Sequence, residues 1–214
     1  ANPQALVSTD WLADHLEDAQ LRLLDATWHL PPLKKDARAE YDAAHIPGAS
    51  YFDIDAISDP ESDLPHMLPS PDLFAERMGA LGIDNSSHVV VYDDYGLFSA
   101  ARVWWMFRIY GHERVSLLNG GSLKWRREGR AMTSDKTEPA PADFEAGFRP
   151  ELVRNAAEML SNIDSRRMQV LDARAHARFI GEAPEPRPGL RSGHIPGSLS
   201  LSFDQLLDPE AKTL

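Results

Sequence analysis

Apolar and polar positions along the first 130 residues predict short buried strands that alternate with amphipathic helices. The strands are runs of apolar, often β-branched residues that end at polar or glycine positions. The run VVVY, residues 89–92, is apolar throughout, a pattern typical of a central parallel strand that is covered on both faces. The predicted strands are RLLDA (22–26), SHVVVYD (87–93) and RVSLLNGG (114–121).

Between these strands, apolar residues recur at helical spacing behind residues that favour helix N-termini. Ser70 followed by Pro71 is one such start, and Gly82 is the matching stop. Strands that alternate with helices indicate an α/β domain with a mainly parallel sheet over residues 1–130. The predicted helices are 8–18, 70–83, 99–112 and 121–129, together with a polar helix or loop over 36–49.

Residues 131–150 are polar and contain prolines, so we predict a linker there. Behind it, the segment 150–163 predicts a helix that opens a second α/β unit near Glu151. The strands predicted for this unit are MQVLDA (168–173) and SLSLSF (198–203).

The tetrapeptide His-Ile-Pro-Gly occurs twice, starting at His45 and at His194, which are 149 residues apart. Each copy follows a strand that ends in Leu-Asp-Ala, and the two aspartates, Asp25 and Asp172, are 147 residues apart. Two blocks with the same order of features at nearly one offset indicate a duplicated domain. We expect both histidines to be structural, with their rings bonded to the backbone of a tight turn.

Composition and charge argue against several classes of function. The formal net charge of the 214 residues is −11, whereas nonspecific binding to nucleic acid or to anionic membranes needs a basic surface. No run of about 20 apolar residues predicts a membrane span. No signal peptide is visible, so we expect a cytoplasmic protein, or a mitochondrial one if a transit peptide has been removed. Cysteine is absent and the eight histidines show no ligand spacing, so we expect no metal and no cofactor.

The loop after the central predicted strand, YDDYGLFSAARVWW (92–105), is the first candidate for chemistry. In open α/β sheets, ligands bind beyond the carboxyl ends of the strands, where this loop joins a strand to a helix. Its backbone N–H groups could surround an anion, but Asp93 and Asp94 at its start would repel one. We therefore interpret it as a structural loop without a catalytic role. Trp104 and Trp105 are expected to pack inside the protein.

Taken together, several segments resemble the two-domain rhodanese-like sulfurtransferases, and more closely those members that use 3-mercaptopyruvate. The resemblance runs from Leu6 to Leu214. It rests on both His-Ile-Pro-Gly turns and on three longer segments, YDDYGLFSAARVWWMFRIYGH (92–112), VSLLNGG (115–121) and PEPRPGLRSGHIPGS (184–198).

The resemblance implies an α/β fold of tandem rhodanese-like domains, each a mainly parallel sheet flanked by helices. Residues 1–130 correspond to a first, non-catalytic domain and residues 131–150 to the linker. Residues 151–214 correspond to the N-terminal part of the second, catalytic domain, which is incomplete in this chain.

In that family, a cysteine of the second domain lies in a loop whose amides lower the pKa of the thiol. The thiolate takes a sulfur atom from the donor, becomes a persulfide and passes the outer sulfur to a thiol or to cyanide. The offset between the two blocks places this loop at about residue 241, beyond Leu214, and aligns Asp93 with the cysteine. We therefore expect residues 1–214 not to transfer sulfur alone and to need a C-terminal segment as a partner.

Two arginines match family residues that hold the donor's carboxylate and carbonyl, namely Arg178 and Arg187. A guanidinium can bind a carboxylate through two parallel hydrogen bonds, so a pair of arginines would orient a small anion. Without the resemblance, both would be interpreted as surface ion pairs with Glu182, Glu185 or acids of the linker. Arg187 favours 3-mercaptopyruvate as the donor, because members that prefer thiosulfate tend to lack it.

Asp55 and His66 match first-domain residues that the family places near the cleft between the domains. There they would polarise a serine of the catalytic loop, as an auxiliary proton relay. The alternative left open is that His66 caps a loop while Asp55 binds backbone amides. The resemblance places the two arginines on one wall of the cleft and this pair on the other.

Two further functions remain as alternatives. One is a thiosulfate:cyanide sulfurtransferase with the same architecture, and the other is a non-catalytic rhodanese-like binding module. The expected partners are a small anionic sulfur donor, a thiol acceptor such as thioredoxin or a small thiol, and cyanide. No nucleic acid or membrane is expected among them.

Overall fold

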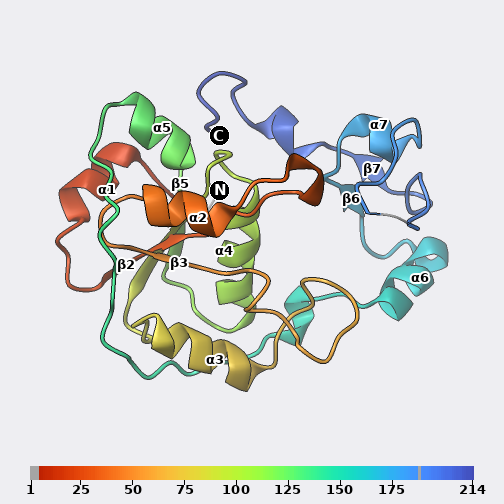
Figure 1. Cartoon of the computed structure of the whole chain (residues 1–214). Helices are drawn as coiled ribbons and strands as arrows, with labels where there is room; N and C mark the ends of the chain where they lie inside the picture. Colours follow the sequence, from red (N-terminus) through yellow and green to blue (C-terminus); the bar gives the residue numbers. More distant parts are fainter. Residues whose placement is uncertain (1–4, 188) are drawn as a thin grey trace.

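The computed structural model describes residues 5–187 and 189–214, and its first part is built around a five-stranded parallel sheet (Figure 1). The strand order is β1-β5-β4-β2-β3, and every neighbouring pair is parallel. The continuous apolar strand β4 lies between β5 and β2, as its sequence predicts, and residues 89–92 are fully buried. The strands are β1 (Leu6–Val7), β2 (Leu21–Asp25), β3 (Ala49–Tyr51), β4 (His88–Tyr92) and β5 (Val115–Leu118).

Helices cover both faces of this sheet, and α1, α2 and α3 begin at side-chain caps. The side chains of Ser8, Asp36 and Ser70 accept hydrogen bonds from the backbone amides three residues ahead, at 3.0, 3.0 and 3.2 Å. The helices of this part are α1 (Thr9–His15), α2 (Ala37–Ala43), α3 (Pro71–Ala80), α4 (Ser99–Ile109) and α5 (Gly121–Arg127), with a short 3₁₀ turn η1 (Pro31–Leu33).

The core consists of two hydrophobic clusters, one on each face of the sheet. Helices α3 and α4 close one cluster with residues such as Phe74 and Phe107, and α1, α2 and α5 close the other with residues such as Leu12 and Trp125. Alternate residues of β4 belong to opposite clusters, with Val89 and Val91 in the first and Val90 and Tyr92 in the second. Cover on both faces explains why residues 89–92 of this strand are all apolar.

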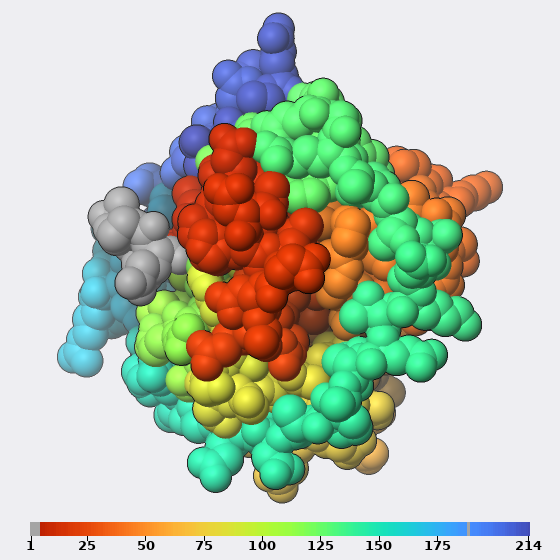
Figure 2. Space-filling model, turned by 90° about the vertical axis from the view of Figure 1, so that its left-hand side faces the viewer, coloured from red at the N-terminus to blue at the C-terminus, as the bar shows by residue number. Residues whose placement is uncertain are grey.

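The segment expected as a linker, residues 131–149, forms a strap along the first part of the chain. It has no helix or strand beyond one bridge between Thr133 and His45. Phe144 is buried in the first cluster, and the amide of Ala142 donates to the carbonyl of Gly79 at 2.9 Å. Figure 2 shows this segment running over the surface beside the N-terminal region. The strap therefore packs as part of the first region.

Residues 150–214 form a small second region with the predicted order of elements. The predicted helix over 150–163 is wrong at its start, because Asn155 and Glu158 form a capping box that begins the helix at Ala156. The second region contains η2 (Pro150–Leu152), α6 (Ala156–Ser165), β6 (Leu171–Asp172), α7 (His176–Phe179), β7 (Leu199–Ser200) and η3 (Phe203–Leu206).

Strands β6 and β7 pair in parallel with each other alone among the described residues, and each is only two residues long. The predicted strands MQVLDA and SLSLSF are therefore longer than the strands that form. Two contacts with the first region lie near the C-terminal end: Phe203 packs on Phe98, and the amide of Leu214 donates to Asn119 Oδ1 at 2.9 Å. No described helix is long and apolar enough to cross a membrane.

Candidate functional site

The candidate site lies beyond the carboxyl ends of β2 and β3, where an open parallel sheet presents its loops. Trp28 follows β2, Asp55 follows β3, and His66 lies in the long loop that leads to α3. The second region contributes Arg187, whose side chain reaches His66 from 121 positions further along the chain. The fold thus brings three of the four predicted site residues together.

Asp55 and His66 form a direct hydrogen bond between Oδ1 and Nε2 at 2.6 Å. The second carboxylate oxygen of Asp55 accepts the indole N–H of Trp28 at 3.0 Å, and the Trp28 and His66 rings meet edge to face at 4.9 Å. Backbone amides are bound by Asp53 instead, which accepts the N–H groups of Asp55 and Ala56. The geometry therefore matches a carboxylate–imidazole relay and not an amide-binding loop carboxylate.

Arg187 faces the other nitrogen of the His66 ring, with Nη2 at 3.5 Å from Nδ1. A guanidinium only donates, so Nδ1 accepts and Nε2–H donates to Asp55. Arg187 forms no ion pair with any described residue, although it is only partly buried. An unpaired guanidinium beside a carboxylate–imidazole pair is suited to bind a small carboxylate.

Arg178 lies on α7 and pairs with Glu185, the ion pair that the sequence leaves open as an alternative. The other carboxylate oxygen of Glu185 accepts from Arg174 at 2.8 Å, and the Glu185 side chain is 4% exposed. The hydrogen bond from Arg178 is the main reason that the pKa of Glu185 is lowered. Arg178 Nε is buried without a hydrogen-bond partner.

In the loop after β4, a carboxylate of the chain itself binds the backbone amides. Asp93 is fully buried, and its carboxylate accepts the backbone amides of Tyr95, Phe98 and Ala100 at 2.9, 2.7 and 2.9 Å. Burial raises the pKa of this carboxyl group, while the amide hydrogen bonds act against that rise. The chain's own carboxylate thus fills the cradle, which agrees with the interpretation of a structural loop.

Both turn histidines bond to the backbone, as the sequence predicts. His45 Nδ1 lies 2.7 Å from the carbonyl of Tyr41, and His194 Nδ1 lies 2.8 Å from the carbonyl of Phe179. Trp104 and Trp105 are partly buried against the first core cluster. Across residues 5–187 and 189–214, no group of three or more histidine, aspartate and glutamate side chains is arranged to hold a metal ion.

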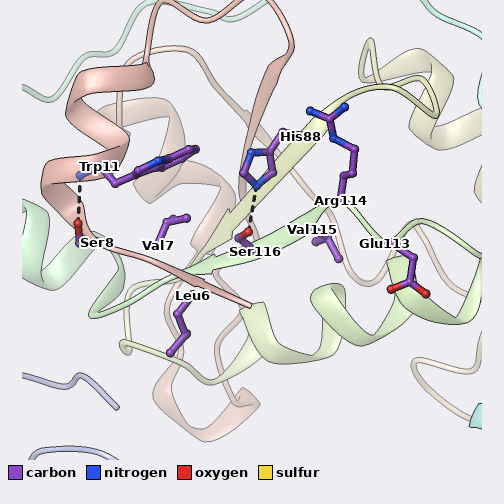
Figure 3. A pocket seen from close by; sticks show the side chains of 9 residues that line it. All are labelled: Leu6, Val7, Ser8, Trp11, His88, Glu113, Arg114, Val115 and Ser116. Carbon is purple, nitrogen blue, oxygen red and sulfur yellow. Dashed lines mark hydrogen bonds between the residues drawn. The ribbon is translucent and has the colours of Figure 1, made fainter. Parts of the chain in front are cut away.

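A pocket of about 690 Å³ lies at the opposite ends of the strands, where β4 and β5 begin (Figure 3). Its polar side chains partly satisfy one another, since His88 Nε2 lies 3.0 Å from Ser116 Oγ. It holds none of the residues that the sequence singles out. The pocket is lined by Leu6, Val7, Ser8, Trp11, His88, Glu113, Arg114, Val115 and Ser116.

Sequence reasoning missed three residues that shape the site. Trp28 could have been found, because it directly follows a strand that ends at the ligand-binding edge of the sheet. Arg102, which donates from α4 to the carbonyl of His66, and Arg174, which shares Glu185 with Arg178, carry no comparable signal. Their partners are set by how loops fold back in space.

Comparison with known proteins places this geometry in a family. The rhodanese-like domain family matches residues 8–128. Human 3-mercaptopyruvate sulfurtransferase is 48% identical over 98% of this chain and 74% of its own length, and bovine thiosulfate sulfurtransferase is 47% identical over 95% and 71%. The crystal structure of SseA from Escherichia coli, a 3-mercaptopyruvate sulfurtransferase, matches with a TM-score of 0.87 and 40% identity over 95% of this chain and 77% of that one. The chain belongs to the rhodanese-like sulfurtransferases.

Proposed function

We propose that this protein binds 3-mercaptopyruvate and transfers its sulfur to a thiol or to cyanide through a cysteine persulfide. The 214 residues contain no cysteine, so the nucleophile is supplied by a segment outside them. In this proposal, residues 1–130 are the non-catalytic domain, residues 131–150 join it to the second region, and residues 151–214 hold the donor for the cysteine. The relatives named for 3-mercaptopyruvate support this choice of donor.

In the proposed reaction, the cysteine thiolate attacks the sulfur atom of the donor. A sulfur–sulfur bond forms and the carbon–sulfur bond breaks, so that its electron pair leaves on carbon as the enolate of pyruvate. The enolate takes up a proton and departs as pyruvate. The persulfide then gives its outer sulfur to the acceptor thiolate or to cyanide, and the cysteine returns as a thiolate.

The observation that carries the proposal is the unpaired Arg187 beside the Asp55–His66 pair. A guanidinium with no carboxylate partner among the described residues is a ready site for the donor's carboxylate. Arg178 would bind the same donor through guanidinium N–H groups that its ion pair with Glu185 does not use. The two arginines would then fix the donor's orientation.

The Asp55–His66 pair would move the proton that the reaction needs. The free imidazole nitrogen Nδ1 can accept a proton once Arg187 turns to the donor, and Asp55 holds the opposite nitrogen. The serine that this pair would polarise belongs to the cysteine-bearing segment. The pair therefore acts on a group that the segment brings into the cleft.

The exposed apolar surface of the second region supports the placement of that segment. Leu171 and Leu199, the residues that pair β6 with β7, are 58% and 50% exposed, and Leu206 is 51% exposed. Leucines at strand positions normally lie under neighbouring strands or helices. We propose that the cysteine-bearing segment completes this sheet and covers these side chains.

The test is the choice of donor after substitution of Arg187 in the intact sulfurtransferase. In R187A, kcat/KM for 3-mercaptopyruvate should fall about thirtyfold, because one charged hydrogen-bond partner of about 2 kcal/mol is lost. Thiosulfate has no carboxylate and should lose much less. R191A serves as the matched control, since Arg191 is exposed and lies in the same loop. Equal losses of kcat/KM with both donors would show that Arg187 does not distinguish 3-mercaptopyruvate from thiosulfate. That result would favour thiosulfate as the donor.

The acceptor and the compartment are finer parts of the same proposal. We propose a thiol acceptor, thioredoxin or a small thiol, with cyanide as the alternative. A cytoplasmic location is proposed, and the plant relative described as mitochondrial supports the mitochondrion as the alternative.

A further inference from the structure

We propose that Arg102 is a positioning residue, which fixes His66 through its backbone and so aims the imidazole at Asp55. The expected effect on catalysis rests on the proposed function, whereas the expected effect on the position of His66 does not. Arg102 lies on α4. Among the described residues, no hydrogen bond, ion pair or ring contact joins it to Asp55 or to the imidazole ring of His66. Its Nη2 donates a hydrogen bond to the carbonyl oxygen of His66.

The backbone of His66 needs such a partner. Its φ angle is +60°, in the left-handed region that non-glycine residues adopt only at a cost of roughly 1–2 kcal/mol. Residues held in this region persist when their surroundings over-determine them. The hydrogen bond from Arg102 to the carbonyl oxygen of His66 ties this turned backbone to α4.

Tyr110, the C-cap residue of helix α4, holds the same loop at a second point close by. The hydroxyl of Tyr110 donates to the carbonyl of Pro69 at 2.5 Å, and Tyr110 is completely buried. Burial raises the pKa of Tyr110 to about 12, so this hydroxyl keeps its proton at any physiological pH. The loop before α3 is therefore tied to one rigid helix at residues 66 and 69.

Arg102 is poorly explained by any other role. It forms no ion pair with a described residue, its Nε is buried without a partner, and burial lowers its pKa. Its guanidinium lies 5.8 Å from the Trp105 ring, a modest contact. A partly buried cation without a carboxylate partner loses hydration free energy on folding. The hydrogen bond from Arg102 to the His66 carbonyl is the interaction that offsets this cost.

Arg108 on the same helix provides the matched comparison. It also lies over a tryptophan, at 5.1 Å from the Trp104 ring, but it pairs with Glu113 at 2.8 Å and does not contact the loop of His66. Loss of either arginine removes a charge and a cation–π contact from α4. Only loss of Arg102 should disturb the site.

The first experiment observes the site by NMR in the 214-residue chain, without any need for activity. In R102M, the contact between the Trp28 and His66 rings should be lost, and the Trp28 indole N–H should exchange with solvent at least about tenfold faster, since its acceptor Asp55 is no longer held by His66. R108M should leave both signals unchanged. R102K, which retains a donor of similar reach, should restore part of the contact.

The second experiment measures turnover in the intact sulfurtransferase. R102M should lower kcat about tenfold with little change in KM for the donor, and it should have no further effect in a H66A background, because Arg102 acts only through His66. If R102M does not fold, R102K and R102Q are compared by the same two readouts.

The outcomes separate this inference from the proposed function. An unchanged ring contact in R102M, or an equal loss of kcat in the presence and absence of His66, overturns the inference. A lost contact with unchanged kcat upholds the positioning role of Arg102 and overturns the proton relay of Asp55 and His66.

Discussion

The two regions contain the same local motifs, yet they bury them to very different degrees. Leu24 and Leu171 both precede the aspartate of Leu-Asp-Ala, and they are 1% and 58% exposed. Ile46 and Ile195 occupy the same place in the two His-Ile-Pro-Gly turns, and they are 0% and 41% exposed. The same residues in the same local sequence are therefore core in one region and surface in the other.

The cause of the difference is the number of neighbouring elements. Strand β2 has β3 on one side and β4 on the other, whereas β6 pairs only with β7 in the described chain. Every hydrophobic residue that the structure shows as buried lies at or before Phe144. Burial is thus a property of the assembled sheet and its helices, and not of the motif.

The duplicated aspartates show the same contrast in their chemistry. Burial raises the pKa of Asp25, although Thr27 donates a backbone hydrogen bond to it. The side-chain hydrogen bond from Arg174 lowers the pKa of Asp172, which lies in the open second region. One sequence position therefore carries opposite shifts, set by desolvation in one copy and by a cation in the other.

The largest expected effect is in amide hydrogen exchange of the 214-residue chain. Amides of β2 and β4 should exchange only on global unfolding, so they should be roughly a thousandfold or more slower than amides 170–173 and 199–203. Addition of the cysteine-bearing segment should slow exchange in the second region. Equal strong protection of both regions in a monomer of this chain would contradict the comparison and favour a non-catalytic binding module.

A smaller effect is expected from matched truncations in the two turns. I46A should cost the first region about 2–5 kcal/mol, because it leaves a cavity in a closed core. I195A should cost the second region less than about 1 kcal/mol, since its side chain already meets solvent. Amide exchange at increasing urea concentration reports each region separately. Similar losses would show that the second region has a core of its own.

The smallest effect is the pH dependence that the two aspartates contribute. The folded pKa of Asp25 is raised, so its contribution is present below the unfolded value of about 3.9 and is lost as pH rises through the folded pKa. The folded pKa of Asp172 is lowered, so its contribution is present above about 3.9 and is lost as pH falls through the folded pKa. As pH rises, the carboxyl ¹³C shift of Asp172 should titrate before that of Asp25. D25N and D172N should each remove the pH dependence of stability that the replaced aspartate contributes. A shift in the same direction for both would break the contrast.

Much of the fold could be predicted from the sequence, because its signals are local. The apolar run of β4 indicated a central strand, and Ser70 followed by Pro71 marked the start of α3. The packing of the predicted linker was harder to predict, because free and packed segments can share the same composition of polar residues and prolines. Phe144, a single buried aromatic residue, makes this segment part of the first core.

The candidate site was predictable only in part. Asp55, His66, Arg178 and Arg187 were found through the resemblance to a family, whereas no local pattern shows that Asp55 meets His66 or that Arg187 reaches across to it. Trp28 and Arg102 belong to other elements and enter through folding alone. A site assembled from loops separated by many residues leaves little trace in any short window of sequence.

The sequence by itself determined the geometry of the repeated turn. Gly48 and Gly197 have φ angles of +79° and +82°, although Ile46 in the first turn is buried and Ile195 in the second is exposed. Proline and glycine dictate that geometry through steric contacts and hydrogen bonds that span only a few residues. The tertiary structure alone decided which copy is buried, which aspartate gains or loses its proton more easily, and which side chains meet at the site. Those properties depend on neighbours that are distant in the chain, and their contacts arise only when the sheet and its covering helices assemble.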